Sequence, residues 1–106
     1  MPPEFTARVT SAAAQRNGRR LYLEYCSICH GERGDGQGAR VSAFATPPRD
    51  FSDEAWRRST TADRVFLTIR TGVPGTAMPG WRALGDDALV DLTAYVLSVA
   101  RDKGRS

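Results

Sequence analysis

The residues Cys26-Ser27-Ile28-Cys29-His30 have the types and the spacing that bind a haem covalently. Two thiols that add across the two vinyl groups of one porphyrin must lie a short, fixed distance apart. An imidazole on the next residue can then reach the iron. The chain has 2 cysteines and 1 histidine, and all of them lie in this stretch. We therefore expect Cys26 and Cys29 to attach a haem and His30 to bind its iron.

Three other chemistries use a Cys-x-x-Cys pair. A thioredoxin-like redox pair follows a strand in a βαβ pattern, which the sequence does not contain. A structural zinc site normally needs four nitrogen or sulfur ligands, and the stretch offers three. A disulfide between Cys26 and Cys29 would close too short a loop to stabilise the fold much. The motif therefore favours haem attachment.

A second candidate iron ligand, Met78, lies in the segment Val73–Trp81, whose two prolines and two glycines exclude regular structure. Apart from Met1 it is the only methionine of the chain. Methionine commonly fills gaps in an apolar core, but its thioether is also an axial ligand of haem iron. We expect Met78 to take the position opposite His30.

A helix is predicted over residues 12–26 and would carry the first cysteine. Gly18, Tyr22 and Cys26 follow one another at four-residue steps and so share one helix face. Glycine inside a helix costs about 1 kcal/mol relative to alanine, which indicates close approach of another helix at Gly18. The alternative is a break in the helix after Asn17.

Two more helices are predicted downstream. The first is capped by Thr60, Thr61 or Asp63, runs to about Arg70 and ends at Gly72. Apolar side chains recur at helical spacing in both: Ala62, Val65, Phe66 and Ile69 in the first, and Leu89, Leu92, Tyr95, Val96 and Val99 in the second.

The last helix is expected to start with Asp86 as its N-cap and to run to about Arg101. Its apolar stripe should pack against the glycine face of the first helix, with Asp91 on the solvent side. No internal repeat and no strand-like alternation is present.

The stretch between the first two helices is rich in glycine and proline. Residues 31–38 lack the Gly-Lys-Ser/Thr ending of a phosphate-binding loop and follow no strand. A backbone carbonyl from the loop around Pro47 and Pro48 could instead accept a hydrogen bond from the free nitrogen of His30 and orient its ring.

Length and composition indicate one globular domain. The chain has 106 residues, of which 41% are hydrophobic and 25% charged. We expect residues 1–11 to be an N-terminal extension or linker, residues 12–102 the domain, and residues 103–106 a tail. No apolar run approaches the ~20 residues of a membrane span, and the first residues do not form a signal peptide. An export signal or membrane anchor is therefore expected outside this sequence.

The formal net charge of +3 does not indicate nucleic-acid binding. The arginines are scattered singly or in pairs, without a basic helix or interleaved aromatic residues. A mixed, solvated surface is the simpler interpretation, and steering toward an acidic redox partner is a second one.

The chain resembles the class I, bacterial-type, monohaem cytochromes c between Gly18 and Arg101. Four stretches carry the resemblance: Gly18-x3-Tyr22-x3-Cys26, Leu92-Thr93-Ala94-Tyr95-Val96, Pro74-Gly75-Thr76-Ala77-Met78-Pro79 and Pro47-Pro48-Arg49-Asp50-Phe51. The resemblance implies an all-α cytochrome c fold, with three main helices and long loops wrapped round one covalently bound haem c.

The resemblance also implies roles for residues around the haem. Thr76 and Arg49 would contact the propionates, and Trp56 could occupy the indole position that binds a propionate. Either Pro47 or Pro48 would supply the carbonyl that holds the ligand histidine. The lysine ring of mitochondrial-type members is absent, since Lys103 is the only lysine, so their partner surface is not implied.

The expected function is transfer of single electrons between respiratory redox partners by a monomeric, non-enzymatic carrier. Its expected location is periplasmic or otherwise extracytoplasmic, with a membrane tether in the full-length protein as a possibility. Ala77 and Trp81 are candidates for a small apolar docking patch. The alternative is a cytochrome c module of a larger redox enzyme, such as a terminal oxidase or a reductase. A third function is a gas-sensing or peroxidatic haem, from which Met78 would dissociate.

Overall fold

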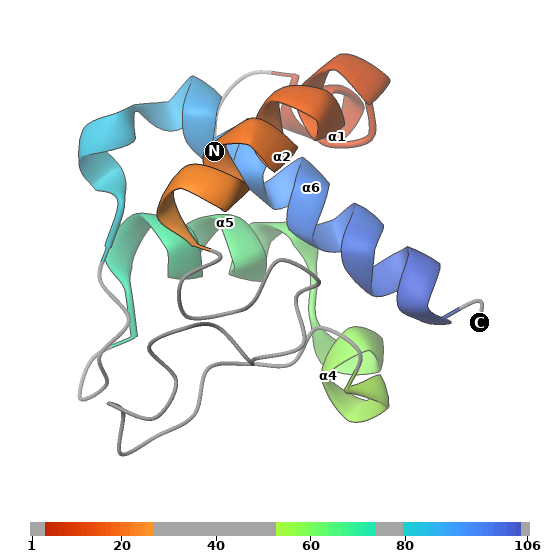
Figure 1. Cartoon of the computed structure of the whole chain (residues 1–106). Helices are drawn as coiled ribbons and strands as arrows, with labels where there is room; N and C mark the ends of the chain where they lie inside the picture. Colours follow the sequence, from red (N-terminus) through yellow and green to blue (C-terminus); the bar gives the residue numbers. More distant parts are fainter. Residues whose placement is uncertain (1–3, 27–52, 74–79, 105–106) are drawn as a thin grey trace.

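The computed structural model describes residues 4–26, 53–73 and 80–104, and these residues form helices and no strand (Figure 1). The elements in chain order are α1 (Phe5–Arg8), α2 (Ala12–Tyr25), α4 (Glu54–Ser59), α5 (Ala62–Thr71), the 3-10 helix η2 (Arg82–Leu84) and α6 (Asp86–Gly104). The expected all-α fold with α2, α5 and α6 as main helices is confirmed.

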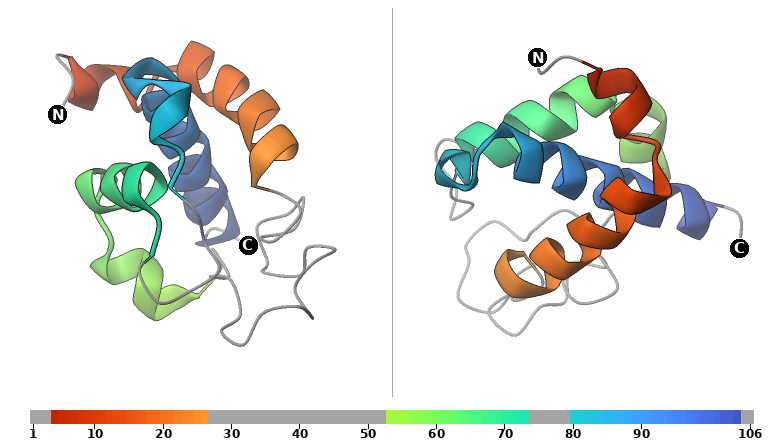
Figure 2. Two further views of the ribbon diagram at one scale, coloured as in Figure 1. Left: turned by 90° about the vertical axis from the view of Figure 1, so that its left-hand side faces the viewer. Right: turned by 90° about the horizontal axis from the view of Figure 1, so that it is seen from above.

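Helix α6 is the centre of the fold, and α2 and α5 pack on different sides of it (Figure 2). The contact with α2 is closest at Gly18, where an added Cβ would lie 1.9 Å from the carbonyl oxygen of Asp91 and 2.9 Å from the Cβ of Tyr95. One turn later the rings of Tyr22 and Tyr95 meet, with centroids 5.1 Å apart. Helix α2 is continuous through Gly18, so the predicted close crossing is confirmed and the alternative of a break is wrong.

Asp91 does not lie on the solvent side of α6, contrary to the expectation from its place outside the apolar stripe. Its side chain is only 15% exposed and accepts a hydrogen bond from Asn17 Nδ2 at 2.7 Å. Asn17 precedes Gly18, and the close crossing at that glycine brings the amide within reach of the carboxylate. The crossing therefore turns an apparent surface residue into a contact between helices.

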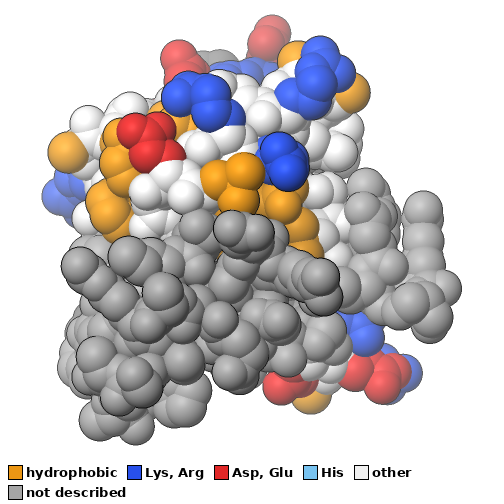
Figure 3. Space-filling model, in the orientation of Figure 1, with side chains coloured by type: hydrophobic (Ala, Val, Ile, Leu, Met, Phe, Trp, Pro, Cys, Tyr) orange, Lys and Arg blue, Asp and Glu red, His pale blue; other side chains and the backbone are white. Residues whose placement is uncertain are grey.

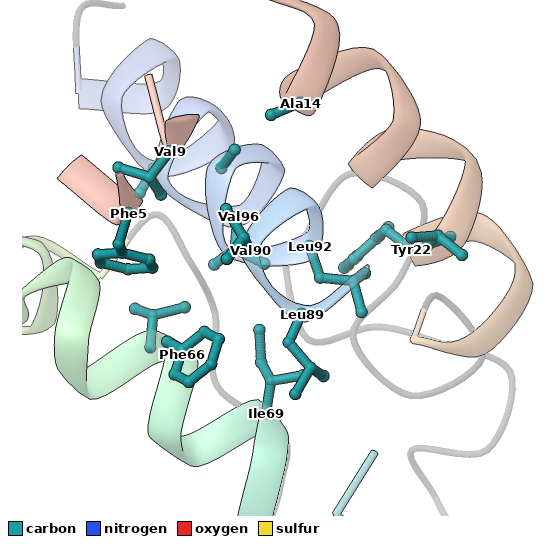
Figure 4. Packing of buried hydrophobic residues seen from close by; sticks show 14 residues of the cluster. Phe5, Val9, Ala14, Tyr22, Phe66, Ile69, Leu89, Val90, Leu92 and Val96 are labelled. Carbon is teal, nitrogen blue, oxygen red and sulfur yellow. The ribbon is translucent and has the colours of Figure 1, made fainter. Parts of the chain in front are cut away.

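Helix α5 packs on α6 through its apolar stripe, of which Val65, Phe66 and Ile69 are buried (Figure 4). Its N-cap is Thr61, whose hydroxyl accepts from the backbone N–H of Arg64 at 3.2 Å. It ends at Gly72, which has a φ of 76° and thus the left-handed conformation that favours glycine. The predicted extent of this helix is confirmed.

Helix α6 begins and ends differently from the prediction. Asp86 is its first residue rather than its cap, and the carbonyl of Gly85 accepts the first hydrogen bond, from Leu89, at 3.1 Å. The helix continues past Arg101 to Gly104, which includes part of the expected tail. The stripe itself is as predicted, with Leu89, Leu92 and Val96 buried and Tyr95 and Val99 half-buried.

The expected extension of residues 1–11 contains α1, which packs on α6. Phe5 and Val9 are buried in the common core, and Phe5 meets Phe66 edge-on with ring centroids 5.5 Å apart (Figure 4). Arg8 pairs with Asp87 at 2.8 Å. This part of the N-terminal stretch therefore packs against the helical core, as a free linker would not.

Replacement of Gly18 by alanine is expected to lower the free energy of unfolding by about 3 kcal/mol or more, because the new methyl group overlaps the backbone of α6. The loss should appear although alanine raises helix propensity by about 1 kcal/mol. Denaturant unfolding of the holoprotein measures it. Arg19→Ala, at the exposed neighbouring position, should change stability by less than about 0.5 kcal/mol. Equal stability of the two variants would contradict the close crossing.

Phe5→Ala is expected to cost about 3 kcal/mol, the lower end of the range for a buried phenylalanine. The exposed neighbour provides a matched control, since Thr6→Ala removes no buried side chain. Thermal and denaturant unfolding of both variants provide the measurement. If Phe5→Ala were as stable as the wild-type protein, α1 would not contribute to the core.

Candidate haem site

Two of the seven predicted site residues, Cys26 and Trp56, lie in the part of the chain that the structure describes. The others lie outside the described residues: Cys29, His30, Arg49, Thr76 and Met78. Pro47, Pro48 and Ala77 also lie outside it. The structure therefore describes the helices and chain segments that lead into the site, and the rest of the chain is grey in Figure 3.

Cys26 is the C-cap of α2. Its backbone N–H donates to the carbonyl of Tyr22 at 2.8 Å, and the residue is half-buried against the edge of the core. Because α2 rises 1.5 Å per residue, Cys26 lies about 12 Å along the helix from Gly18. The helix crossing thus determines where α2 places the first cysteine of the motif.

An aromatic contact joins the end of α2 to Trp81, the last residue of the segment Val73–Trp81 that contains Met78. The rings of Tyr25 and Trp81 have centroids 5.2 Å apart and an interplanar angle of 49°. Trp81 also donates its backbone N–H to the carbonyl of Ile69 at 2.8 Å, which links it to α5. The residue before Cys26 and a residue shortly after Met78 are therefore in direct contact.

Trp56 lies in α4, whose N-cap is Asp53. The carboxylate of Asp53 accepts a hydrogen bond from the backbone N–H of Trp56 at 3.1 Å. The indole is half-buried and packs against the core cluster. The helix places an aromatic side chain at the edge of the core. A contact between this side chain and a propionate remains a prediction.

The described residues fit a covalently bound haem. A thiol, the group that adds to a porphyrin vinyl group, stands at the end of helix α2. The preceding residue, Tyr25, is half-buried and contacts the half-buried Trp81. Within the described ranges, no helix has the length and hydropathy to cross a membrane.

Comparisons with known proteins identify the family of this chain. The family model described as cytochrome c oxidase, cbb3-type, subunit III matches residues 13–96. Cytochrome c55X of Paracoccus denitrificans (strain Pd 1222) is 41% identical over 80 residues, which cover 73% of this chain and 67% of that protein. The solved structure of the KustC0563 c-type cytochrome has a TM-score of 0.63 and 28% identity, and the match covers 77% of this chain and 95% of that one.

The cbb3-type cytochrome c oxidase subunit CcoP of Azospirillum brasilense is 33% identical over 97 residues. These residues are 91% of this chain but 32% of CcoP, so the chain spans about a third of that relative's length. Fold, motif and comparisons together define a c-type cytochrome. The chain belongs to the cytochrome c family of cbb3-type oxidase subunit III, and it is an electron-transfer domain with one covalently bound haem c.

The contact between Tyr25 and Trp81 was not predicted from the sequence, in which Trp81 is a candidate for an apolar docking patch. No local pattern pairs two residues that are more than fifty positions apart. The signal available in the sequence was that an aromatic residue lies directly before the haem motif and another lies three residues after Met78.

The pair of rings should contribute to stability beyond the area that each ring buries. A double-mutant cycle with Tyr25→Leu, Trp81→Leu and the double variant is expected to give a coupling energy of about 0.5–1.5 kcal/mol. Denaturant unfolding of the four holoproteins measures it. Additive losses would show that the rings do not stabilise the site jointly.

Proposed function

We propose that this domain carries single electrons through one haem attached by Cys26 and Cys29, with His30 and Met78 as the axial ligands of its iron. The observation that carries the proposal is the position of Cys26 at the end of α2, which the crossing with α6 holds in place. His30 directly follows the second cysteine, and Met78 lies in the segment whose downstream end contacts Tyr25 through Trp81.

Bound haem c supplies an iron that takes up and releases one electron. In the proposed arrangement the imidazole and the thioether leave no open position for a small molecule, which favours electron transfer without substrate turnover. A thioether ligand stabilises the reduced state and raises the reduction potential relative to two histidines.

Further residues are proposed to orient the bound group. Thr76, Arg49 and Trp56 would contact the propionates, and the carbonyl of Pro47 or Pro48 would accept from the ring N–H of His30. Such a hydrogen bond fixes the orientation of a ligand imidazole and increases its basicity. These roles follow from the resemblance to bacterial cytochromes c.

The relatives support a respiratory, extracytoplasmic setting. A relative named as a cbb3-type oxidase subunit favours exchange of electrons with a membrane-bound respiratory complex. The similarity to cytochrome c55X, of which the chain covers 67%, supports function as a small electron carrier. The similarity to CcoP, of which this chain covers 32%, supports the second candidate function, that of a relay module within a longer chain.

The axial ligation is tested by spectra of the pure holoprotein. The oxidised protein is expected to show the far-red absorption band of methionine–iron ligation, and the reduced protein to bind no carbon monoxide at neutral pH. Met78→Ala should abolish the band completely, lower the reduction potential and allow stoichiometric binding of carbon monoxide. Both forms should keep the haem after denaturation, because the thioethers are unchanged.

Leu67→Ala is the matched control, because Leu67 is exposed on α5 and distant in sequence from the motif. Leu67→Ala should leave the far-red absorption band and the reduction potential unchanged. A wild-type protein that lacks the band and binds carbon monoxide would contradict the Met78 ligand. That result would favour the gas-binding function instead.

A further inference from the structure

Gly80 is in closer contact with a neighbouring segment than a side chain would permit. An added Cβ would lie 2.7 Å from the carbonyl oxygen of Arg70, 2.8 Å from the carbonyl carbon of Thr71 and 3.0 Å from its carbonyl oxygen. All three are backbone atoms at the end of α5, so no rotation of a flexible side chain could relieve the overlap. The backbone of Gly80 therefore lies directly against the last turn of α5.

The contact is reinforced on both sides. The N–H of Trp81 donates to the carbonyl of Ile69 at 2.8 Å, and the N–H of Gly72 donates to the carbonyl of Thr68 at 2.8 Å. The chain thus leaves α5 at Gly72 and returns to the same turn of α5 at Gly80. Gly72 and Gly80 are therefore both held at the last turn of α5.

We propose that Gly80 is a positioning residue for Met78: its backbone contact with Arg70 and Thr71 holds the thioether on the iron. The inference rests on the proposed function, in which Met78 is an axial ligand. Only Pro79 lies between Met78 and Gly80. Since each residue adds at most about 3.6 Å of chain, an anchor at Gly80 restricts the sulfur strongly.

The anchor affects the strength of the proposed bond between the Met78 sulfur and the iron, which is intrinsically weak. A neutral thioether competes with any free ligand of the iron, and it prevails because the protein keeps it close. A restricted ligand has a high effective concentration, and freeing its backbone lowers that concentration. A side chain at position 80 forces the backbone away from Thr71, and external ligands then displace the sulfur more readily.

The test is titration of the oxidised holoprotein with imidazole, which competes for the methionine position. Gly80→Ala is expected to bind imidazole at least tenfold more tightly than wild type and to show a weaker far-red band. Gly80→Val, with a larger overlap, should bind it more tightly still. The free energy of unfolding of each variant is measured in parallel.

A glycine variant elsewhere separates positioning from general loss of stability. At Gly85 an added Cβ meets nothing within 4 Å, but the φ of 90° strains any side chain. Gly85→Ala should therefore lower stability while imidazole affinity changes less than threefold.

A second measurement uses the wild-type protein and does not depend on folding of the variants. Coupling between two sites is reciprocal, so imidazole binding should weaken the anchor in turn. Hydrogen exchange of the Trp81 amide, which donates to Ile69, is expected to accelerate severalfold when imidazole saturates the iron. The Leu89 amide at the start of α6 serves as the internal control and should not change.

The outcomes distinguish this inference from the function on which it rests. A wild-type protein without methionine ligation overturns both. A wild-type protein with the band overturns the inference alone if Gly80→Ala binds imidazole within twofold of wild type. The same holds if Gly85→Ala gives an equal gain in affinity, or if the Trp81 amide exchanges equally in the two ligand states.

Discussion

The backbone contact between Gly18 on α2 and Asp91 on α6 is the constraint on which the rest of the structure depends. Since no side chain separates the helices there, Tyr22 and Tyr95 can meet one turn further on, and the Asn17 amide reaches the Asp91 carboxylate. Helix α6 then buries its other faces against α5 and α1. Helix α2 connects Gly18 to Cys26, so a packing requirement in the core also determines where the chain places the first cysteine of the proposed haem site.

The elements that were predictable have a local cause. The stripe of α5, its cap at Thr61 and its end at Gly72 follow from periodicity and from the backbone preferences of single residues. The covalently bound haem c was predictable because two thioethers on one porphyrin impose a fixed spacing on the cysteines. Helix α1 was not predictable: it has 4 residues, too few for a periodic pattern, and the contact of Phe5 with Phe66 holds it in place. The burial of Asp91 likewise depends on a partner 74 positions away.

Polar contacts define how α1 is aligned rather than how strongly it binds. The Asp87 side chain that pairs with Arg8 is 88% exposed, and a pair so accessible to water contributes little to stability. Arg8 Nη2 also lies 3.9 Å from the Asp91 carboxylate that Asn17 engages. The buried side chains of Phe5 and Val9 therefore provide most of the attachment, and the arginine selects one register of α1 on α6.

The two sides of the proposed haem site need different kinds of support. Two thioethers would hold the haem beside His30. These covalent bonds would keep the imidazole near the iron independently of the fold of the surrounding chain. Met78 has no such bond, and its ligation depends on how the chain is folded on the other side. The sequence marks Gly80 only as one of several turn-forming residues, because composition does not distinguish a glycine needed for a turn from one needed for contact. The structure supplies that distinction: the backbone of Gly80 lies on α5, and Trp81 joins α5 to the end of α2 through Ile69 and Tyr25. Both sides of the site are thereby connected to the same helical core, which favours similar ligand geometry in the oxidised and the reduced state.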